Sequence, residues 1–371
     1  MLVPPPEALI VGGGIAGLAC AITLGRQGWR CSLLERDPQR QRKGQGLLLP
    51  PSGHQALQRL AVGDIASFSA AIDRYELCRP DGRPDQEFAI HGALSLLHRD
   101  LLIALQRSLP ASAGLVAGRC RALETAADGN WHVLCDDLPP LRADLIVAAD
   151  GVGSVCRRQL FPKARLTQER TTELVLVTRD PVLVRTLGNA CRKFQDRSAG
   201  LAIGLLPCRN DQLLLFAQFA RDRHEPCAGP EAAALLRRCF GGWNALLDPL
   251  LDSLDTSDCR LWHTTDLDPL PRLHDGNLVL VGDSGHPLLT VTSQGASSAL
   301  EDAQVLAEEL ASGLHGLSAS LERYSRRRLP LLADLVREGR IKQQQFLAPA
   351  AGSIQASAPL VGFGLEPSLA T

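Results

Sequence analysis

A glycine pattern near the N-terminus constrains the fold of this chain more than any other feature. Gly12, Gly14 and Gly17 form a GxGxxG pattern, preceded by the short apolar run 8–11 and followed by LACAITLGRQG, whose apolar spacing is helical. The stretch RCSLL at 30–34 then has the length and composition of a second buried strand. This order of strand, glycine turn, helix and strand predicts a βαβ unit that binds a dinucleotide.

Each of the three glycines has a physical role in such a unit. One permits a tight turn, one lets the backbone approach a pyrophosphate, and one lets the helix pack closely on the strand. The helix N-terminus offers free N–H groups and a positive dipole end to the phosphates. Glu35 lies 18 residues after Gly17, where a carboxylate can accept hydrogen bonds from ribose hydroxyls. This carboxylate disfavours a 2′-phosphate on the ribose but does not distinguish NAD from FAD. The alternative to dinucleotide binding is a glycine-rich turn in an ordinary doubly wound fold.

Two further apolar runs indicate strands of the same sheet. Residues 141–149 lead into Asp150-Gly151, and residues 277–281 lead into Gly282-Asp283. Between residues 170 and 270 the apolar runs become longer. The stretches TELVLVT, GLAIGLLP and QLLLFAQFA indicate strands of a separate sheet.

The predicted fold class is α/β, with an FAD-binding Rossmann-like (GR2-type) domain and an inserted β-rich substrate domain. The FAD-binding domain is expected to be discontinuous, over residues 1–73, 91–169 and 271–345. The substrate domain is expected over 170–270 together with 74–90, a hairpin whose turn is Asp81-Gly82. Residues 346–371 are expected to form a loosely packed C-terminal tail.

Composition excludes several classes of protein. A net charge of -1 and an aromatic content of 4% argue against nucleic acid as a partner. The N-terminus lacks the pattern of a signal peptide, and no apolar run approaches the roughly 18 residues of a membrane span, so we expect a cytoplasmic protein. The eleven cysteines form no CxxC pair, and Cys259 and His263 lack a second ligand pair, so no metal is expected.

Three stretches together resemble the class A flavoprotein monooxygenases, the para-hydroxybenzoate hydroxylase family. They are GGGIAGL with Glu35-Arg36, ADLIVAADGVGSVCRRQL at 143–160, and DGNLVLVGDSGHPLLTVTSQGASSALEDA at 275–303. The resemblance covers roughly residues 7–340. It implies FAD as the cofactor, bound by the following residues: Gly12, Gly14, Ile15, Ala16, Gly17, Glu35, Arg36, Arg99, Asp150, Gly151, Arg157, Gly282, Asp283, Gln294, Gly295 and Ala296.

Several of these residues have a structural alternative. Asp150-Gly151 could be only a turn, Asp283 an N-cap, and Arg99 a surface helix residue. His286 is expected to order its loop rather than act as an acid or base. Arg326, Arg327 and Arg328 are expected to form a solvated helix face.

The resemblance implies an NAD(P)H-dependent monooxygenase. NAD(P)H would bind transiently as co-substrate, and a flavin C4a-hydroperoxide would hydroxylate an aromatic or other electron-rich small molecule. The alternatives are a flavin-dependent reductase of the same fold and a catalytically idle FAD-binding protein. The WxWxIP motif of flavin halogenases is absent. The residues name no catalytic base, do not separate NADH from NADPH, and leave the oligomeric state open.

The stretch GDSGHPLLTVTSQG departs from the family pattern in its middle. The family usually has proline near position 290 and often glycine near position 293, where this chain has Thr290 and Ser293. Proline fixes φ and glycine removes a side chain, so the departure raises the question of whether oxygen chemistry beside the flavin is altered.

Overall fold

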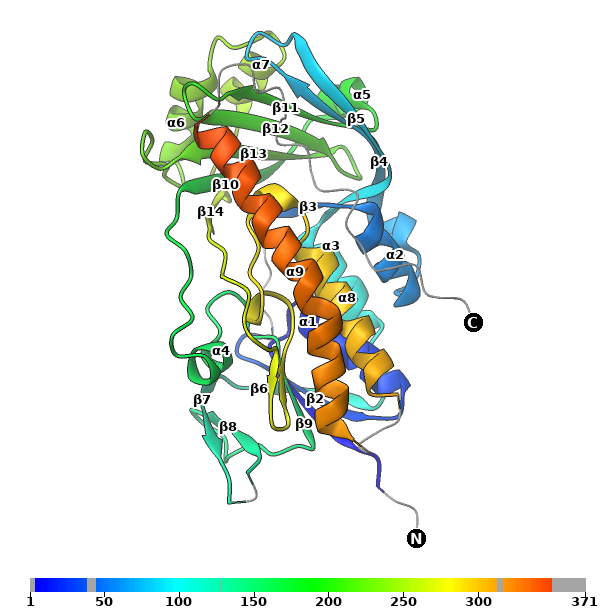
Figure 1. Ribbon diagram of the computed structural model, residues 1–371. Coiled ribbons are helices and arrows are strands. Elements are labelled where there is room, and N and C mark those ends of the chain that lie inside the picture. The colour runs from blue at the N-terminus through cyan, green and yellow to red at the C-terminus, as the bar shows by residue number, and fades with distance from the viewer. Residues whose placement is uncertain (1–3, 39–44, 128, 312–315, 349–371) are drawn as a thin grey trace.

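The computed structural model describes residues 4–38, 45–127, 129–311 and 316–348. Two large β-sheets lie at opposite ends of the molecule, and the long helix α9 (Leu317–Leu347) runs from one to the other (Figure 1). None of the helices in the described part of the chain is long and apolar enough to cross a membrane.

The first sheet is Rossmann-like, as predicted. Its order is β15-β16-β9-β1-β2-β6, and every pair is parallel except β15 with β16. Its strands are β1 (Glu7–Val11), β2 (Arg30–Glu35), β6 (Ala113–Ala117), β9 (Leu145–Ala148), β15 (His274–Asp275) and β16 (Leu278–Leu280). Parallel strands need crossover connections and are covered on both faces, which explains the near-continuous apolar runs in β1 and β9.

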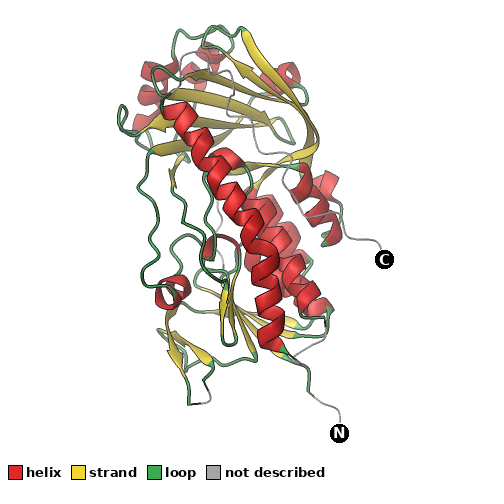
Figure 2. Ribbon diagram, in the orientation of Figure 1, coloured by secondary structure: helices red, strands yellow, loops and turns green. Residues whose placement is uncertain are grey.

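Four helices of this part of the molecule pack together. Helix α1 (Ile15–Arg26) packs against both α3 (His98–Arg107) and α8 (Gly295–Glu309), and α9 packs against α8 (Figure 2). The α1–α8 contact includes a hydrogen bond from the Thr23 hydroxyl to the Ala303 carbonyl oxygen, which joins residues 280 positions apart in the sequence. The glycine turn and the GDSGHPLLTVTSQG stretch are thereby brought to the same edge of the sheet.

The second sheet has eight strands in the order β14-β10-β13-β12-β11-β4-β5-β3. All of its neighbouring strands are antiparallel except β4 with β11. The strands are β3 (Gly46–Leu49), β4 (Ser69–Cys78), β5 (Pro84–Leu97), β10 (Thr171–Arg179), β11 (Ala190–Asp196), β12 (Leu201–Pro207), β13 (Gln212–Ala220) and β14 (Arg260–Thr264).

One face of the second sheet packs into a hydrophobic core with three helices that the sequence reasoning did not predict. They are α5 (Pro181–Leu187), α6 (Glu231–Phe240) and α7 (Leu247–Ser253). Alternate residues of β12 are buried in this core, namely Leu201, Ile203 and Leu205. The opposite face of the sheet is therefore the one that can meet a ligand.

The hairpin predicted at 74–90 is present but longer than expected. Its strands β4 and β5 extend from residue 69 to residue 97, and β3 joins the edge of the sheet. The second sheet thus includes residues 46–49, 69–73 and 91–97, which the sequence assigned to the FAD-binding domain. The end of β5, ALSLL at 93–97, is buried without a break, so it lacks the apolar–polar alternation that indicates a strand.

The remaining elements are small. A two-stranded sheet of β7 (Cys120–Thr125) and β8 (Trp131–Cys135) lies beside α4 (Val155–Leu160), and α2 (Pro51–Arg59) packs on α8. Three short 3-10 turns are η1 (Ile65–Ser67), η2 (Gly282–Ser284) and η3 (Thr290–Thr292). Helix α9 extends to Leu347, and residues 349–371 of the expected tail lie outside the described residues.

Candidate active site

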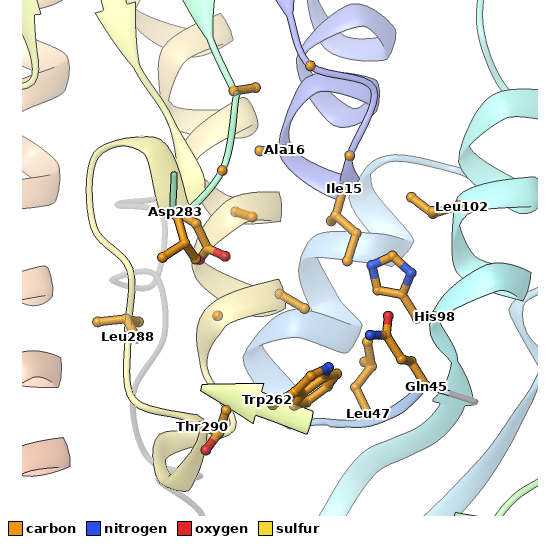
Figure 3. A pocket seen from close by; sticks show the side chains of 18 of the residues that line it. Ile15, Ala16, Gln45, Leu47, His98, Leu102, Trp262, Asp283, Leu288 and Thr290 are labelled. Carbon is orange, nitrogen blue, oxygen red and sulfur yellow. The ribbon is translucent and has the colours of Figure 1, made fainter. Parts of the chain in front are cut away.

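A cavity of about 920 Å³ lies between the two sheets and is lined by residues from both. At one end it meets the carboxyl ends of β1, β2 and β9, where ligands bind in open parallel sheets. At the other end it meets the face of the second sheet that lies opposite α5, α6 and α7. In Figure 3, Ala16 and Asp283 lie toward the first end, and Leu47, Trp262 and Thr290 toward the second.

The glycine turn between β1 and α1 forms the first wall of the cavity. Gly12 has φ +111°, and a Cβ there would lie 2.3 Å from the carbonyl oxygen of Ala149; a Cβ on Gly17 would lie 1.9 Å from the carbonyl oxygen of Gly12. The fold itself therefore requires both glycines. Gly14 is different, because a Cβ there would meet nothing within 4 Å. Its open side belongs to the cavity.

Glu35, at the end of β2, is fixed beside this turn. Its carboxylate accepts hydrogen bonds from the backbone N–H groups of Gly13, at 2.8 Å, and Asp37, at 3.0 Å. Glu35 and Arg36 both line the cavity. A carboxylate held at this place can accept hydrogen bonds from a ribose, and the guanidinium of Arg36 carries a charge suited to phosphate.

The loop after β9, which contains Asp150-Gly151, forms a turn and also faces the cavity. The Asp150 carboxylate accepts hydrogen bonds from the Val155 N–H, at 2.7 Å, and the Ser154 hydroxyl, at 2.6 Å, so it orders the start of α4. Asp150 and Gly151 also line the cavity. The turn alternative and the ligand-facing position are therefore compatible.

Arg157 lies behind this loop rather than in the cavity. Its side chain is buried and donates hydrogen bonds to the carbonyl oxygens of Asp283, at 3.0 Å, and Ser284, at 2.9 Å. Burial lowers its pKa, with Asp150 opposing that effect. Among the residues proposed as cofactor ligands, Arg157 thus positions the Asp283 loop from outside the cavity.

A buried network of charges fixes the Gly282-Asp283 loop from its other side. The Asp302 carboxylate accepts hydrogen bonds from the Gly282 N–H, at 2.6 Å, from His286, at 2.5 Å, and from Arg328, at 2.7 Å. Arg328 also pairs with Glu301 at 3.0 Å. Burial alone raises the pKa of Asp302, but His286 and Arg328 outweigh it and lower the pKa to about 2.

This network decides two of the sequence expectations. His286 orders the loop, as predicted, since its ring is buried against Asp302. The expectation of a solvated Arg326–Arg328 face is wrong for Arg328, whose side chain is 1% exposed, while Arg326 and Arg327 are exposed. Arg328 turns inward because α9 packs on α8 along this line of residues.

The N-terminus of α8 opens on the cavity beside Asp283. Gln294, Gly295 and Ala296 line it, and the first turn of the helix carries no acidic residue. A Cβ on Gly295 would lie 4.0 Å from an oxygen of the Asp283 carboxylate. The carboxylate is therefore an acceptor next to a positive helix end, an arrangement that suits a ligand with hydroxyls and a polar, partly anionic ring edge.

Arg99 lies outside the lining of the cavity, and its contact with FAD stays a prediction. Its side chain is partly exposed beside Asp100, at 3.3 Å, and it does not line the cavity. The preceding residue, His98, does line it, together with Gln45 and Leu102 (Figure 3). One residue along a helix is a rotation of about 100°, so the start of α3 presents His98 and turns Arg99 away.

The sequence reasoning missed a polar group on the second sheet, formed by Glu173, Lys193 and Gln218. The three side chains lie on β10, β11 and β13, are buried, and line the cavity. Lys193 donates to the Gln218 amide oxygen at 3.0 Å. Burial lowers the pKa of Lys193 to about 8 and raises that of Glu173. A single charged residue in an otherwise uncharged strand, as in TTELVLVT, was the available signal.

Thr290 and Ser293 differ in what they do to the loop before α8. Thr290 donates a hydrogen bond to Glu173 at 2.7 Å, so its hydroxyl joins this loop to the second sheet. Ser293 is in the left-handed conformation, with φ 56° and ψ 19°. The backbone at 293 thus has the conformation that favours glycine, which explains the residue expected there.

We predict that Ser293→Gly stabilises the protein slightly. A left-handed residue other than glycine costs about 1–2 kcal/mol, and the greater freedom of glycine in the unfolded chain offsets about 0.5–1 kcal/mol of that gain. The net gain is therefore about 1 kcal/mol or less, measured by thermal unfolding. Ser318→Gly, at an exposed position in α9, is the matched control, because glycine in a helical conformation lowers stability. A loss at Ser293 as large as that at Ser318 would contradict the argument.

Comparisons with known proteins agree with this geometry. The model of the FAD binding domain family matches residues 136–339, and that of the NAD(P)-binding Rossmann-like domain matches residues 10–39. An FAD-dependent monooxygenase from Beauveria bassiana is 30% identical over 331 residues, which cover 83% of this chain and 77% of that protein. The 3-amino-4-hydroxybenzoate 2-monooxygenase of Streptomyces cremeus is 30% identical over 353 residues, which cover 92% and 87%.

Solved structures show the same fold. Klebsiella pneumoniae HpxO in complex with FAD and uric acid superposes with a TM-score of 0.84 at 22% identity, covering 93% of this chain and 89% of that one. Within the described residues, no three His, Cys, Asp or Glu side chains gather to hold a metal ion. The cofactor is FAD, and the chain belongs to the class A flavoprotein monooxygenases, enzymes that use NAD(P)H and oxygen to oxidise a small molecule.

Proposed function

We propose that FAD lies along the cavity from the glycine turn to the N-terminus of α8. The single observation that carries this is one continuous cavity joining the Gly12–Gly17 turn to the face of the second sheet. The residues present fit the cofactor, because the open side of Gly14 leaves room for a pyrophosphate and the first turn of α1 carries no acidic residue. When bound, FAD supplies the hydride acceptor and the oxygen chemistry.

The chain's own groups would divide the cofactor between them. Glu35 would accept hydrogen bonds from the ribose, and Arg36 would lie near the phosphates. Asp283 would accept hydrogen bonds from the ribityl hydroxyls. Gln294, Gly295 and Ala296 would lie beside the ring, where the dipole of α8 favours negative charge. Asp150 and Gly151 would close the pyrophosphate side.

The second sheet would cover the substrate. Its cavity-facing side chains include Val175, Leu206, Leu214, Phe216 and Trp262, which exclude water from the reacting groups. We place the boundary of this substrate-binding part by the strands, at residues 46–49, 69–97 and 171–264, in place of 74–90 and 170–270.

The substrate is proposed to be a small, electron-rich aromatic or heteroaromatic ring. The face of the second sheet contributes mainly apolar and aromatic side chains to the cavity, with the polar group of Glu173, Lys193 and Gln218 among them, as is common in small-ligand sites. The relatives named above point the same way, one acting on 3-amino-4-hydroxybenzoate and another binding uric acid. The eleven cysteines are all free thiols, which supports the proposed location in the reducing cytoplasm.

The test is an assay of the purified holoenzyme. We expect a yellow protein that NAD(P)H bleaches under nitrogen and that, with a bound aromatic substrate, transfers one atom of ¹⁸O₂ to the product. NAD(P)H consumption recovered entirely as peroxide with every ring tried would favour an idle flavoprotein. Product formed under nitrogen would favour a reductase. A colourless protein that fails to take up FAD would end the proposal.

A further inference from the structure

The sheet end of the cavity holds one buried carboxylate and one buried ammonium. Glu173 on β10 is 8% exposed and Lys193 on β11 is 3% exposed, and both line the cavity. Charged residues are almost never this buried unless they are paired or have a function. The main core of this sheet, with α5, α6 and α7, lies on its other face, and on the cavity-facing side the Lys193 ammonium lies 5.8 Å from the centre of the Phe346 ring.

The strand register places these groups side by side. On β10, Glu173 stands between Gln218 of β13 and Trp262 of β14. From β11, Lys193 extends across β12 at Gly204 and donates a hydrogen bond to Gln218. A Cβ on Gly204 would lie 2.0 Å from the ring of Phe216. The ring of Phe216 occupies the space that a side chain at 204 would take. The result is a row of an indole, a carboxylate, an amide and an ammonium across the sheet.

Thr290 fixes the orientation of the Glu173 carboxylate. It donates to Oε1 at 2.7 Å, and the carboxylate lines the cavity. Oε2 can therefore accept a hydrogen bond from a ligand. Because Thr290 stands in the loop that leads into α8, the carboxylate is tied to the part of the site beside the proposed flavin ring.

The charges at this end of the cavity balance. Of the described residues that line it, Glu173 is the only acid and Lys193 the only lysine or arginine, while the imidazole of His263 is largely exposed and bonds Glu169. Within the described ranges, no further lysine or arginine at this end would balance a substrate carboxylate, and burying an unbalanced charge is costly. The pair is suited instead to a neutral ligand with one donor and one acceptor.

Building on the proposed function, we propose that Glu173 and Lys193 recognise a neutral ring that carries an acidic N–H or O–H next to a carbonyl oxygen, namely a lactam or its enol form. Lys193 binds the carbonyl oxygen, and Glu173 is the catalytic base. The N–H or O–H bond breaks, its proton goes to Glu173 Oε2, and its electron pair stays on the ring. The ring becomes an anion balanced by Lys193 and is more readily oxygenated; the proton returns when the product leaves.

The ligand class can be tested by titrating the holoenzyme and following the flavin absorbance. The probes are 2-pyridone and 2-quinolone, which are neutral, and 4-hydroxybenzoate, which carries a carboxylate. We expect a neutral probe to bind at least tenfold more tightly than 4-hydroxybenzoate and to accelerate NAD(P)H oxidation. Tighter binding of 4-hydroxybenzoate, or no response to either neutral probe, would overturn the proposal.

The roles of the two residues are separated by matched variants, assayed with the best-binding probe. Glu173→Gln should keep FAD and the Kd of the probe but lower kcat about 10²- to 10⁴-fold, the range for loss of a general base. Lys193→Met should weaken probe binding at least tenfold. Glu76→Gln and Arg192→Met are the controls, since this pair, at 2.6 Å, lies in the same sheet without lining the cavity.

These results distinguish the inference from the proposed function. A wild-type enzyme without FAD or NAD(P)H oxidation would remove the proposed function itself. An active wild-type enzyme whose Glu173→Gln variant keeps its kcat would remove only the inference.

Thr290→Pro tests the positioning role of Thr290, because Leu289 already has the extended conformation that precedes proline. It should retain FAD but lower kcat; Thr290→Ser, which keeps the hydroxyl, should restore it.

Probe binding should also depend on pH through Lys193. The charged or titratable groups that act on it are Glu173 from β10, Cys191 from its own strand and Lys342 from α9, and burial lowers its pKa to about 8. Because the protonated amine binds the carbonyl, the Kd should be constant at lower pH and rise above about pH 8. Lys193→Arg, which stays protonated, should remove this rise. A wild-type Kd that is unchanged up to pH 9.5 would contradict the role of Lys193.

Discussion

Gly14→Val should give a folded protein that purifies without FAD. A side chain at this position meets no protein atom within 4 Å, so the apoprotein should keep its thermal stability. The same side chain enters the space that we propose for the pyrophosphate, where the backbone must approach the phosphates closely. We expect the Kd for FAD to rise at least about a hundredfold, which is about 2.7 kcal/mol, measured by flavin fluorescence during reconstitution.

Gly17→Ala is the informative comparison. Its Cβ would lie 1.9 Å from the backbone oxygen of Gly12, so α1 must shift from the turn. This variant should lose stability as well as FAD, whereas Gly14→Val should lose FAD alone. If Gly14→Val retained FAD with unchanged affinity, the pyrophosphate would have to lie elsewhere.

The second large effect is expected from Arg328→Met. Removing the guanidinium leaves Asp302 and Glu301 buried without their common partner. Breaking a buried ion pair in this way costs about 3–5 kcal/mol. For a chain of this length that corresponds to a melting temperature lower by about 5 °C, measured by calorimetry of the apoprotein. FAD affinity should fall too, because Asp302 also holds the Gly282 N–H beside Asp283.

Arg327→Met is the control for this prediction. Arg327 is the next residue in the same helix and also pairs with two carboxylates, those of Glu308 and Glu309, but it is exposed. Exposed pairs contribute less than about 1 kcal/mol. Equal destabilisation by the two substitutions would show that burial of the Asp302 network is not what stabilises the loop.

The parts of the site that could be predicted from sequence are those made by backbone. Gly12, Gly14 and Gly17 could be interpreted because a turn that admits no side chain leaves a pattern of glycines after a strand. Gly282-Asp283 was located in the same way, at the end of an apolar run. In these cases short-range sequence order fixes where the residues lie.

The parts that could not be predicted depend on which way a side chain turns. His98 and Arg99 are adjacent, and only the packing of α3 decides that His98 meets the cavity. Arg328 follows two exposed arginines, and its burial depends on an acidic pair on α8 far away in the sequence. Glu173 and Lys193 lie on strands that are separated by other strands of the sheet, so their proximity follows from sheet order rather than from spacing.

Helix α9 has a consequence for how ligands come and go. Its 31 residues span about 46 Å, and it is bonded at both ends: Tyr324 to the Leu280 carbonyl in the first sheet, and Gln343 to Thr171 in the second. A hinge that parted the two sheets would have to break these contacts together. We therefore expect the enzyme to work as a fixed frame, in which the cofactor and the short loops move and the walls do not.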